Sequence, residues 1–334
     1  MAIDKTEQLH TSTHSFTSSM TEHSVGQGYA HSKIILMGEH SVVYDYPAIA
    51  LPFTEARIEA IITPSLKETH TLSSDYYHGT LSEAPDTLAN VVRGVELTLD
   101  SFKLPKDPLH ISVQSTIPVG RGMGSSAAVV VAIVRAICNF YHFAINDYQL
   151  HFIVNQAEVI AHESTSGIDT LMASSNTPII YRKSKQPIPF EFKMDAYLIV
   201  ADSGQEGHTK EAVAKVRRLK ESRPEFVQNA MQSIGDFVQQ AHEAIKQNDR
   251  IELGRLMTYN HYYLNQLAVS NTRLDNIVNA AWIAGALGAK LTGGGLGGCV
   301  IALADDASTA QSIEQAMKHA GAVQTWSMPL HGKD

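Results

Sequence analysis

The sequence predicts an α+β protein of two domains that share a cleft. The chain has 334 residues, and one hydrophobic core stops growing at roughly 250–300 residues. Strand-like and helix-like patterns both occur in each half, which favours a mixed architecture. A stretch with two prolines at 184–189 is the best linker candidate. We therefore expect domains at residues 25–187 and 188–334, after a mobile tail at residues 1–24 that is rich in Ser, Thr and His.

The expected first domain begins with strands and continues with helices. His110–Ser115 alternates between apolar and polar residues, as a half-buried strand does. The apolar segment Ser125–Phe143 lacks Gly and Pro and is too long for a strand, so we expect a buried helix. Residues 66–86 are polar and turn-rich and give no prediction. The other expected elements are strands at a sheet edge at Ile34–Met37 and Arg57–Thr63, a helix at Gln149–Glu163 and a strand at Pro178–Arg182.

The expected second domain starts with a strand at Tyr197–Ala201 and is mostly helical. A strand pair, Val300–Ala304 and Val323–Trp326, flanks a helix at Ser308–His319. The remaining helices are expected at Thr209–Lys220, Pro224–Lys246, Ile251–Leu267 and Arg273–Ala286. No internal repeat of fixed period is apparent.

Composition narrows the classes of partner. The formal net charge is -8, and the Lys and Arg residues are scattered, which argues against nucleic acid or a membrane surface. Cys138 and Cys299 are the only cysteines, so neither a disulfide framework nor a cysteine metal site is expected. No apolar run reaches the roughly 18 residues of a membrane span, and no signal-peptide core is seen. We therefore expect a cytoplasmic protein with small-molecule partners.

The strongest chemical signal is a glycine-rich loop, Pro118–Ala128, which precedes the long apolar helix. Gly120, Gly122 and Gly124 lack side chains and let backbone N–H groups converge on an anion, while the helix start adds unpaired donors. The loop lacks the Gly-Lys-Ser/Thr of a Walker A motif, and no acidic residue completes a dinucleotide fingerprint. It is either a phosphate loop of another type or an ordinary turn with Ser125 as N-cap.

The glycine loop resembles the signature loop of the GHMP kinases, a superfamily that includes galactokinase, homoserine kinase, mevalonate kinase and phosphomevalonate kinase. The sequence Gly-Glu-His at 38–40, followed by Val-Val-Tyr at 42–44, is most similar to the mevalonate kinases. Two segments, residues 30–33 and 164–167, depart from the family motifs. The resemblance therefore does not fix the shape of these two loops. The further segments that match family motifs are Lys33–Tyr44 with Pro47-Ala-Ile, Glu158–His162 with Ser166–Asp169, and Lys290–Cys299.

This resemblance implies an architecture and a reaction. The architecture is an N-terminal ribosomal-protein-S5-like domain and a C-terminal ferredoxin-like domain, with the active site in the cleft between them. The reaction is ATP-dependent phosphorylation of mevalonate, a step of isoprenoid precursor biosynthesis, with Mg²⁺ as cofactor and a homodimer expected by analogy. A sister kinase acting on phosphomevalonate or another small alcohol is the alternative. A catalytically silent nucleotide-binding module is the hypothesis from another class.

The resemblance also implies roles for a carboxylate and a cation. Phosphoryl transfer needs charge neutralisation, metal bridging and an aimed hydroxyl. Asp169 is the candidate base or hydroxyl-orienting group, with an Asx-turn residue as the structural alternative. Lys33, at the start of the first strand, is its candidate partner. We expect the two side chains to meet at the mouth of the glycine loop.

The metal and nucleotide sites are expected nearby. Glu158 and the Ser126 hydroxyl are the candidate Mg²⁺ ligands, and Ser125 could replace Ser126. Glu158 could instead be an exposed helix charge, although its neighbours are apolar. The candidate ATP- and phosphate-binding residues are Pro118, Gly120, Gly122, Met123, Gly124, Ser125, Ser126 and Ala127.

Four further residues are candidates for binding the acceptor substrate. Glu39 and His40 come from the first domain, and Gly293 and Gly294 come from the second. His40 could hydrogen-bond a hydroxyl or, when charged, a carboxylate, whereas an unpaired surface histidine is the alternative. His162 is interpreted as a packed or capping residue.

Overall fold

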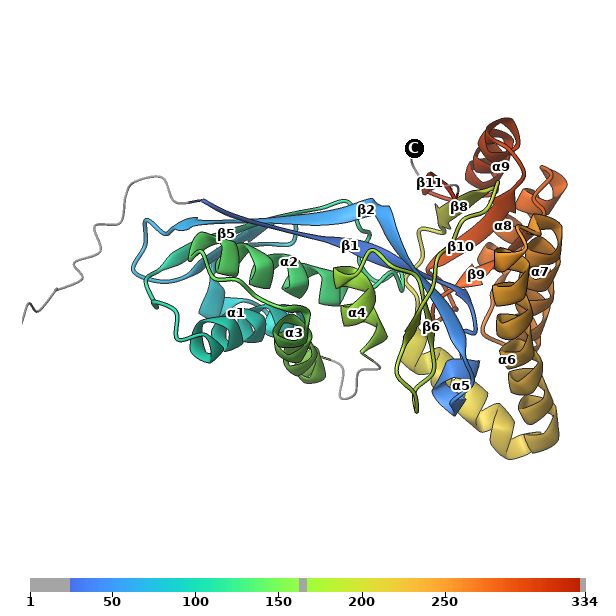
Figure 1. Ribbon diagram of the computed structural model, residues 1–334, viewed down its shortest axis with the longest axis horizontal. Coiled ribbons are helices and arrows are strands. Elements are labelled where there is room, and N and C mark those ends of the chain that lie inside the picture. Colours follow the sequence, from blue (N-terminus) through green and yellow to red (C-terminus); the bar gives the residue numbers. More distant parts are fainter. Residues whose placement is uncertain (1–24, 162–166, 331–334) are drawn as a thin grey trace, which may run out of the picture.

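The computed structural model describes residues 25–161 and 167–330. The predictions for the tail at 1–24 and for His162 lie outside these residues. Within the described ranges, none of the helices combines the length and apolar character that crossing a bilayer requires. Figure 1 shows an elongated molecule, with one sheet and its helices at the left and a second, helix-flanked sheet at the right.

The first sheet is built around one long strand. Among the described residues its path is β4-β3-β5-β2-β6-β7, and β1 pairs antiparallel with β2. The β1/β2 register shifts between His31 and Ser32, directly before Lys33. The strands are β1 (Gly26–Met37), β2 (Ala48–Pro64), β3 (Thr71–Ser74), β4 (Tyr77–Thr80), β5 (Leu109–Ser115), β6 (Ile179–Tyr181) and β7 (Ile188–Pro189).

Four helices pack on one face of this sheet (Figure 1). They are α1 (Ala89–Ser101), α2 (Ser125–Phe140), α3 (Asp147–Ala161) and α4 (Ile168–Ser174), and the short 3₁₀ turns are η1 (Ser41–Tyr44), η2 (Leu81–Glu83) and η3 (Asp86–Leu88). Helix α2 is the central one, and it lies directly on β1. A Cβ atom at Gly28 would stand 2.1 Å from the Ala132 carbonyl oxygen, so only glycine permits this close approach.

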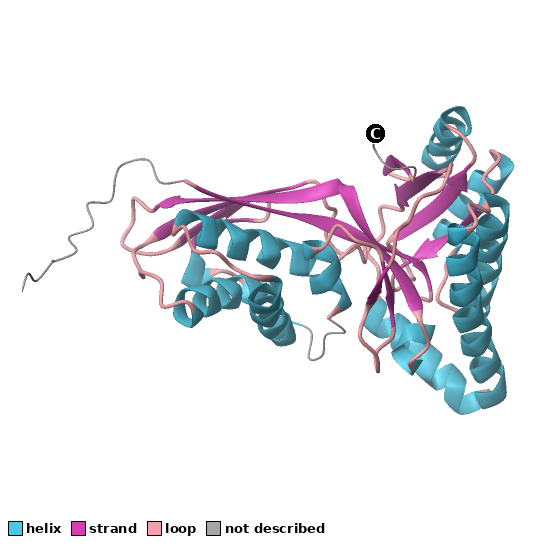
Figure 2. Ribbon diagram, viewed as in Figure 1, coloured by secondary structure: helices cyan, strands magenta, loops and turns pink. Residues whose placement is uncertain are grey.

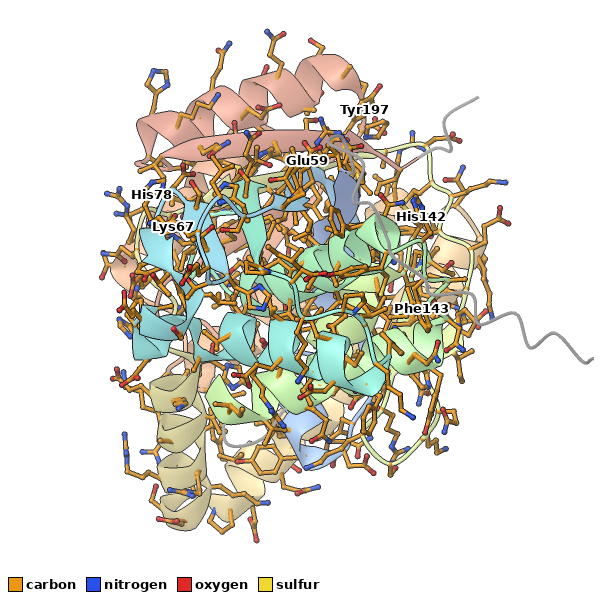
Figure 3. All side chains as sticks on the ribbon, turned by 90° about the vertical axis from the view of Figure 1, so that its left-hand side faces the viewer. Glu59, Lys67, His78, His142, Phe143 and Tyr197 are labelled. Carbon is orange, nitrogen blue, oxygen red and sulfur yellow. The ribbon has the colours of Figure 1, made fainter. Side chains whose placement is uncertain are left out.

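The far end of the first domain is held by aromatic packing. Phe143, after α2, stacks on Phe102, after α1, with ring centroids 4.3 Å apart. Figure 3 looks onto this end, with His142 and Phe143 on one side and Lys67 and His78 on the other. This end is opposite to the one that meets the second domain (Figure 1).

The second sheet has the order β11-β8-β10-β9, and all its pairings are antiparallel. Helices α6, α7 and α8 lie at the right of the molecule (Figure 2), and α6 also contacts β1 and β2 of the first domain. Some apolar side chains of the sheet and its helices form a core of their own, whereas others, such as Leu198, Val200 and Ile301, join the core of the first domain. The elements are β8 (Tyr197–Asp202), β9 (Gly288–Thr292), β10 (Cys299–Ala304), β11 (Gln324–Pro329), α5 (Thr209–Ser222), α6 (Pro224–Lys246), α7 (Arg250–Gln266), α8 (Thr272–Ile283) and α9 (Ala307–His319).

The mixed α+β class is confirmed, but several details of the prediction were wrong. β2 is not an edge strand, because β1 pairs with it on one side and β5 and β6 on the other. The stretch without a prediction contains β3 and β4, and helix α1 was missed. β10 and β11 do not pair with each other, since both pair with β8. β7 pairs with β6, so the predicted linker at 184–189 turns back onto the first sheet. The domain boundary at residue 188 stays a prediction.

Candidate active site

The glycine loop connects β5 to α2 and has a backbone that only glycine adopts easily. Gly120, Gly122 and Gly124 have φ values of 71°, 72° and 76°. Any other residue would be strained in this left-handed region. No side chain caps the first turn of α2, so its N–H groups are available to an anion. Met123 and Ala127 are buried, so only their main chains can serve a ligand.

The second domain lies against this loop. The Gly207 N–H donates to the Gly120 carbonyl at 2.7 Å, and the Arg121 guanidinium donates to Asp202 at 2.8 Å. A Cβ atom at Gly122 would stand 3.7 Å from the Gly294 nitrogen. The loops of the two domains therefore face one another, as the predicted cleft requires.

Lys33 and Asp169 form an ion pair beside the loop. Lys33 Nζ lies 3.1 Å from Asp169 Oδ1, although the two sites are far apart in sequence. Lys33 lies well inside β1, not at the start of a strand as expected, whereas the Asp169 side chain, in the first turn of α4, is 47% exposed. A Cβ atom at Gly124 would stand 3.1 Å from Lys33 Cγ and 3.6 Å from Asp169 Oδ1. The predicted meeting of the two groups at the glycine loop is confirmed.

Ser126 and Glu158 are also brought together. The Ser126 hydroxyl donates to Glu158 Oε1 at 2.8 Å. Glu158 is buried, so it is not the exposed helix charge of the alternative interpretation. Asn90, at the start of α1, donates from Nδ2 to Glu158 Oε1 at 2.8 Å and to Ser126 Oγ at 2.9 Å. The hydroxyl that faces Glu158 is thus that of Ser126, not Ser125.

Glu39 forms a buried ion pair with Lys290 of the second domain. Lys290 Nζ also donates to the Leu291 carbonyl at 2.7 Å. Burial raises the pKa of Glu39 and lowers the pKa of Lys290, while their mutual attraction opposes both shifts. The ammonium of Lys33 also acts, more weakly, to lower the pKa of Glu39.

His40 is buried and neutral. Burial lowers the pKa of His40 to about 4. Its Nε2 lies 2.9 Å from the Gly294 carbonyl oxygen, so Nε2 carries the hydrogen and donates. The positive φ of 61° is unusual for a non-glycine residue and is held by these surroundings. The unpaired surface histidine is excluded, and a charged His40 is disfavoured at neutral pH.

Comparison with known proteins identifies the family. The model of the GHMP kinases N terminal domain matches residues 89–176, and the GHMP kinases C terminal model matches residues 241–323. A mevalonate kinase of Thermococcus gammatolerans is 37% identical, covering 83% of this chain and 88% of its own length. The chain belongs to the mevalonate kinase family. Another member, from Pyrococcus furiosus, is 37% identical over 82% of this chain and 88% of its own length.

Solved structures of the mevalonate kinase family have the same fold. The L. major mevalonate kinase in complex with R-mevalonate is 27% identical, with a TM-score of 0.78, covering 92% of this chain and 97% of that one. The mevalonate kinase of methicillin-resistant Staphylococcus aureus is 30% identical, with a TM-score of 0.72, covering 93% and 100%. The predicted fold class and the predicted kinase activity are therefore confirmed.

Several contacts at this kinase site were not foreseen from the sequence. Asn90 lies in helix α1, which was not predicted, and Asp202, the partner of Arg121, lies outside every motif. Lys290 was assigned to a glycine loop, but it lies in β9, and its side chain is fully buried. A buried lysine in an apolar strand is a signal for an ion pair, since burial of an unpaired charge is costly. Its partner could not be named without the fold.

A separate cavity of about 710 Å³ lies between α6, α7 and α8, and it is lined mainly by aromatic side chains. None of the candidate site residues lines it. The site is therefore defined by the converging loops and ion pairs between the domains, and not by this cavity.

Proposed function

We propose that this kinase transfers the γ-phosphoryl group of ATP to the 5-hydroxyl of (R)-mevalonate and so forms 5-phosphomevalonate. The named relatives and the structural neighbour with bound R-mevalonate support the substrate. The observation that carries the chemistry is the 3.1 Å contact between Lys33 Nζ and Asp169 Oδ1 beside the glycine loop. A carboxylate and an ammonium at this position supply the two charges that an in-line transfer needs.

Asp169 acts on the attacking hydroxyl in this proposal. Its partly exposed carboxylate can accept the hydroxyl proton or orient the hydroxyl toward the phosphorus atom. Lys33 is buried along its stem and presents its ammonium to the same place. There it offsets the negative charge of the transferring group.

The glycine loop holds the triphosphate. The glycines at 120, 122 and 124 leave room for phosphate oxygens, and the N–H groups at the start of α2 point toward them. The proposed nucleotide contacts come from the loop main chain and from the hydroxyls of Ser125 and Ser126. Arg121 is held by Asp202, so this side chain fixes the loop to the second domain.

The donor set near the loop fits a magnesium ion. Ser126 and Glu158 would supply two oxygen ligands, and Mg²⁺ typically takes only one or two from protein beside phosphates and water. A magnesium ion held there would supply positive charge to offset that of the phosphates.

The acceptor substrate is proposed to lie between the two domains. His40 donates from Nε2 to Gly294, so its Nδ1 is left as an acceptor for a substrate hydroxyl. Glu39 is fixed by Lys290, and its Oε2 has no hydrogen-bond partner among the described residues. A buried acceptor of this kind is costly unless a ligand donates to it. Gly293 and Gly294 bring the second-domain main chain close to the loop.

A substrate panel tests the proposal. ADP release is measured with mevalonate, phosphomevalonate, galactose and homoserine, and the product is identified by ³¹P NMR. We expect turnover with mevalonate to exceed that with each other alcohol by at least about 100-fold in kcat/KM, since a site built to hydrogen-bond its substrate can discriminate by about 10⁴-fold. Equal turnover with phosphomevalonate would assign the chain to the sister activity, and no turnover with mevalonate would refute the proposal.

The proposal also covers the oligomeric state of the protein and its cellular compartment. A homodimer is proposed from the family resemblance alone, and light scattering would measure it. A reducing cytoplasm is proposed because Cys138 and Cys299 are both free and buried. Burial raises the pKa of Cys138 to about 12, so its thiol stays protonated and unreactive.

A further inference from the structure

Asn90 joins the two residues that the proposed function assigns to the divalent cation. The side chain is 4% exposed and lies in the first turn of α1, a helix that contributes no other candidate residue. Its Nδ2 donates to Ser126 Oγ at 2.9 Å and to Glu158 Oε1 at 2.8 Å. One amide nitrogen has two hydrogens, so both acceptors can be served at once.

The orientation of this amide is set by charge. If the amide were turned over, its oxygen would face the Glu158 carboxylate, and two acceptors would stand at hydrogen-bond distance without a hydrogen between them. A buried contact of that kind is strongly unfavourable. Asn90 is therefore held as a donor, with its N–H groups directed at the two oxygens.

The oxygen spacing matches a metal site. Ser126 Oγ and Glu158 Oε1 are 2.8 Å apart. Adjacent ligands of an octahedral Mg²⁺, with bonds of about 2.0–2.1 Å, are about 2.9 Å apart. Asn90 also occupies one lone pair of the Ser126 hydroxyl, so the other is left for a cation. Glu158 Oε1 accepts from both Asn90 and Ser126, so a cation bound to Oε1 would take the place of the Ser126 hydrogen there. The amide thus fixes both the separation and the direction of the two oxygens.

We infer that Asn90 is a positioning residue for the divalent cation, which it serves by holding Ser126 Oγ and Glu158 Oε1 as adjacent ligands. This inference rests on the proposed magnesium site and adds a residue to it. Asn90 contacts neither the cation nor the substrate in this scheme. Its effect is therefore on metal affinity, whereas the KM for mevalonate stays unchanged.

The test replaces Asn90 with Leu, which has a similar shape and no donor. Binding of Mn²⁺ to the enzyme with a non-hydrolysable ATP analogue is measured by electron paramagnetic resonance, and turnover is titrated with free Mg²⁺. We expect the metal dissociation constant to rise about 10- to 100-fold, as is typical when a group that orients a ligand is lost. Asn90→Ser, which keeps a shorter donor, should lose less. The matched control is Thr98→Val, which removes a buried hydrogen bond to Gly94 elsewhere on α1 and should leave metal affinity within about twofold.

A second comparison separates positioning from general damage to the fold. In a Ser126→Ala background, Asn90→Leu should weaken metal binding by a smaller factor than in the otherwise wild-type protein, because only Glu158 is then left for Asn90 to position. An unchanged Mn²⁺ affinity in folded Asn90→Leu, or the full loss persisting in Ser126→Ala, would overturn the inference. If Asn90→Leu fails to fold by circular dichroism, Asn90→Ser decides by the same criteria. Mn²⁺ binding is measured without turnover. The role of Asn90 can therefore be judged even if the protein does not phosphorylate mevalonate.

Discussion

Lys290→Met is the most severe test of the buried link between the domains. The substitution removes the ammonium that pairs with Glu39 at a position where Lys290 is 0% and Glu39 is 3% exposed. A methionine fills much of the same volume, so the main effect is an unpaired carboxylate in a buried place. Breaking a buried pair from one side typically costs about 3–5 kcal/mol. We expect a loss of that order in the free energy of unfolding at pH 7.

The loss should depend on pH in a defined direction. Burial already raises the pKa of Glu39, and without Lys290 its attraction no longer opposes that shift. A carboxyl group whose folded pKa is raised binds more protons in the folded state, so stability falls as pH rises from the unfolded pKa to the folded one. Lys290→Met should therefore be relatively more stable near pH 5 than near pH 7.

Urea unfolding followed by circular dichroism measures this effect. Lys246→Met is the matched control, because Lys246 pairs with Glu243 at 2.8 Å on the exposed surface of α6 and should be nearly neutral. The double variant with Glu39→Gln removes both charges and should recover much of the lost stability. A Lys290→Met protein within about 1 kcal/mol of wild type at pH 7, or one without the pH trend, would refute the reasoning.

Three further outcomes follow from the site. Gly124→Ala should lower kcat/KM for ATP at least about tenfold, because the φ of Gly124 is 76° and the new Cβ would lie 3.1 Å from Lys33 Cγ. The circular dichroism spectrum should be unchanged, and full activity would contradict this prediction. Glu158→Gln should raise the free Mg²⁺ needed for half-maximal turnover about tenfold, and an unchanged titration would remove Glu158 from the metal site. Because the pKa of His40 is lowered from 6.5 to about 4, its contribution to stability is lost as pH falls through that window, by about 2 kcal/mol at pH 5. His40→Asn should lack this part of the acid sensitivity in urea unfolding, and an equal drop in both proteins would oppose the assignment.

Local signals in the sequence were enough for the backbone of the glycine loop and for most helices. Glycines before an apolar helix fix the backbone by sterics alone, so Gly120, Gly122 and Gly124 could be assigned without any fold. The meeting of Lys33 with Asp169 was expected only through the family resemblance. No periodicity or spacing connects two residues that lie so far apart in the chain.

Contacts between distant elements were the part that sequence reasoning could not reach. Helix α1 starts without a side-chain cap, but its buried residues Val91, Val95 and Leu99 recur at helical spacing, so the helix carried a signal that was overlooked, whereas the contacts of Asn90 carried none. The long pairing of β1 with β2 crosses a register shift, and the sequence shows only the apolar ends of these strands. Lys290 and Glu39 are each ordinary charged residues until the sheet topology buries them together.

The central claim is that Asp169, which lies beside Lys33, acts in the phosphoryl-transfer step and does not contribute to ATP binding. Single-turnover phosphorylation of mevalonate by Asp169→Asn, with ATP affinity measured in parallel by calorimetry, tests it most directly. We predict ATP affinity within about threefold of wild type and a rate lower by about 10²–10⁴-fold, the range that proton transfer by a placed side chain supplies. Asp236→Asn, an exposed carboxylate on α6, is the control and should retain the wild-type rate. A wild-type rate for Asp169→Asn would contradict the account.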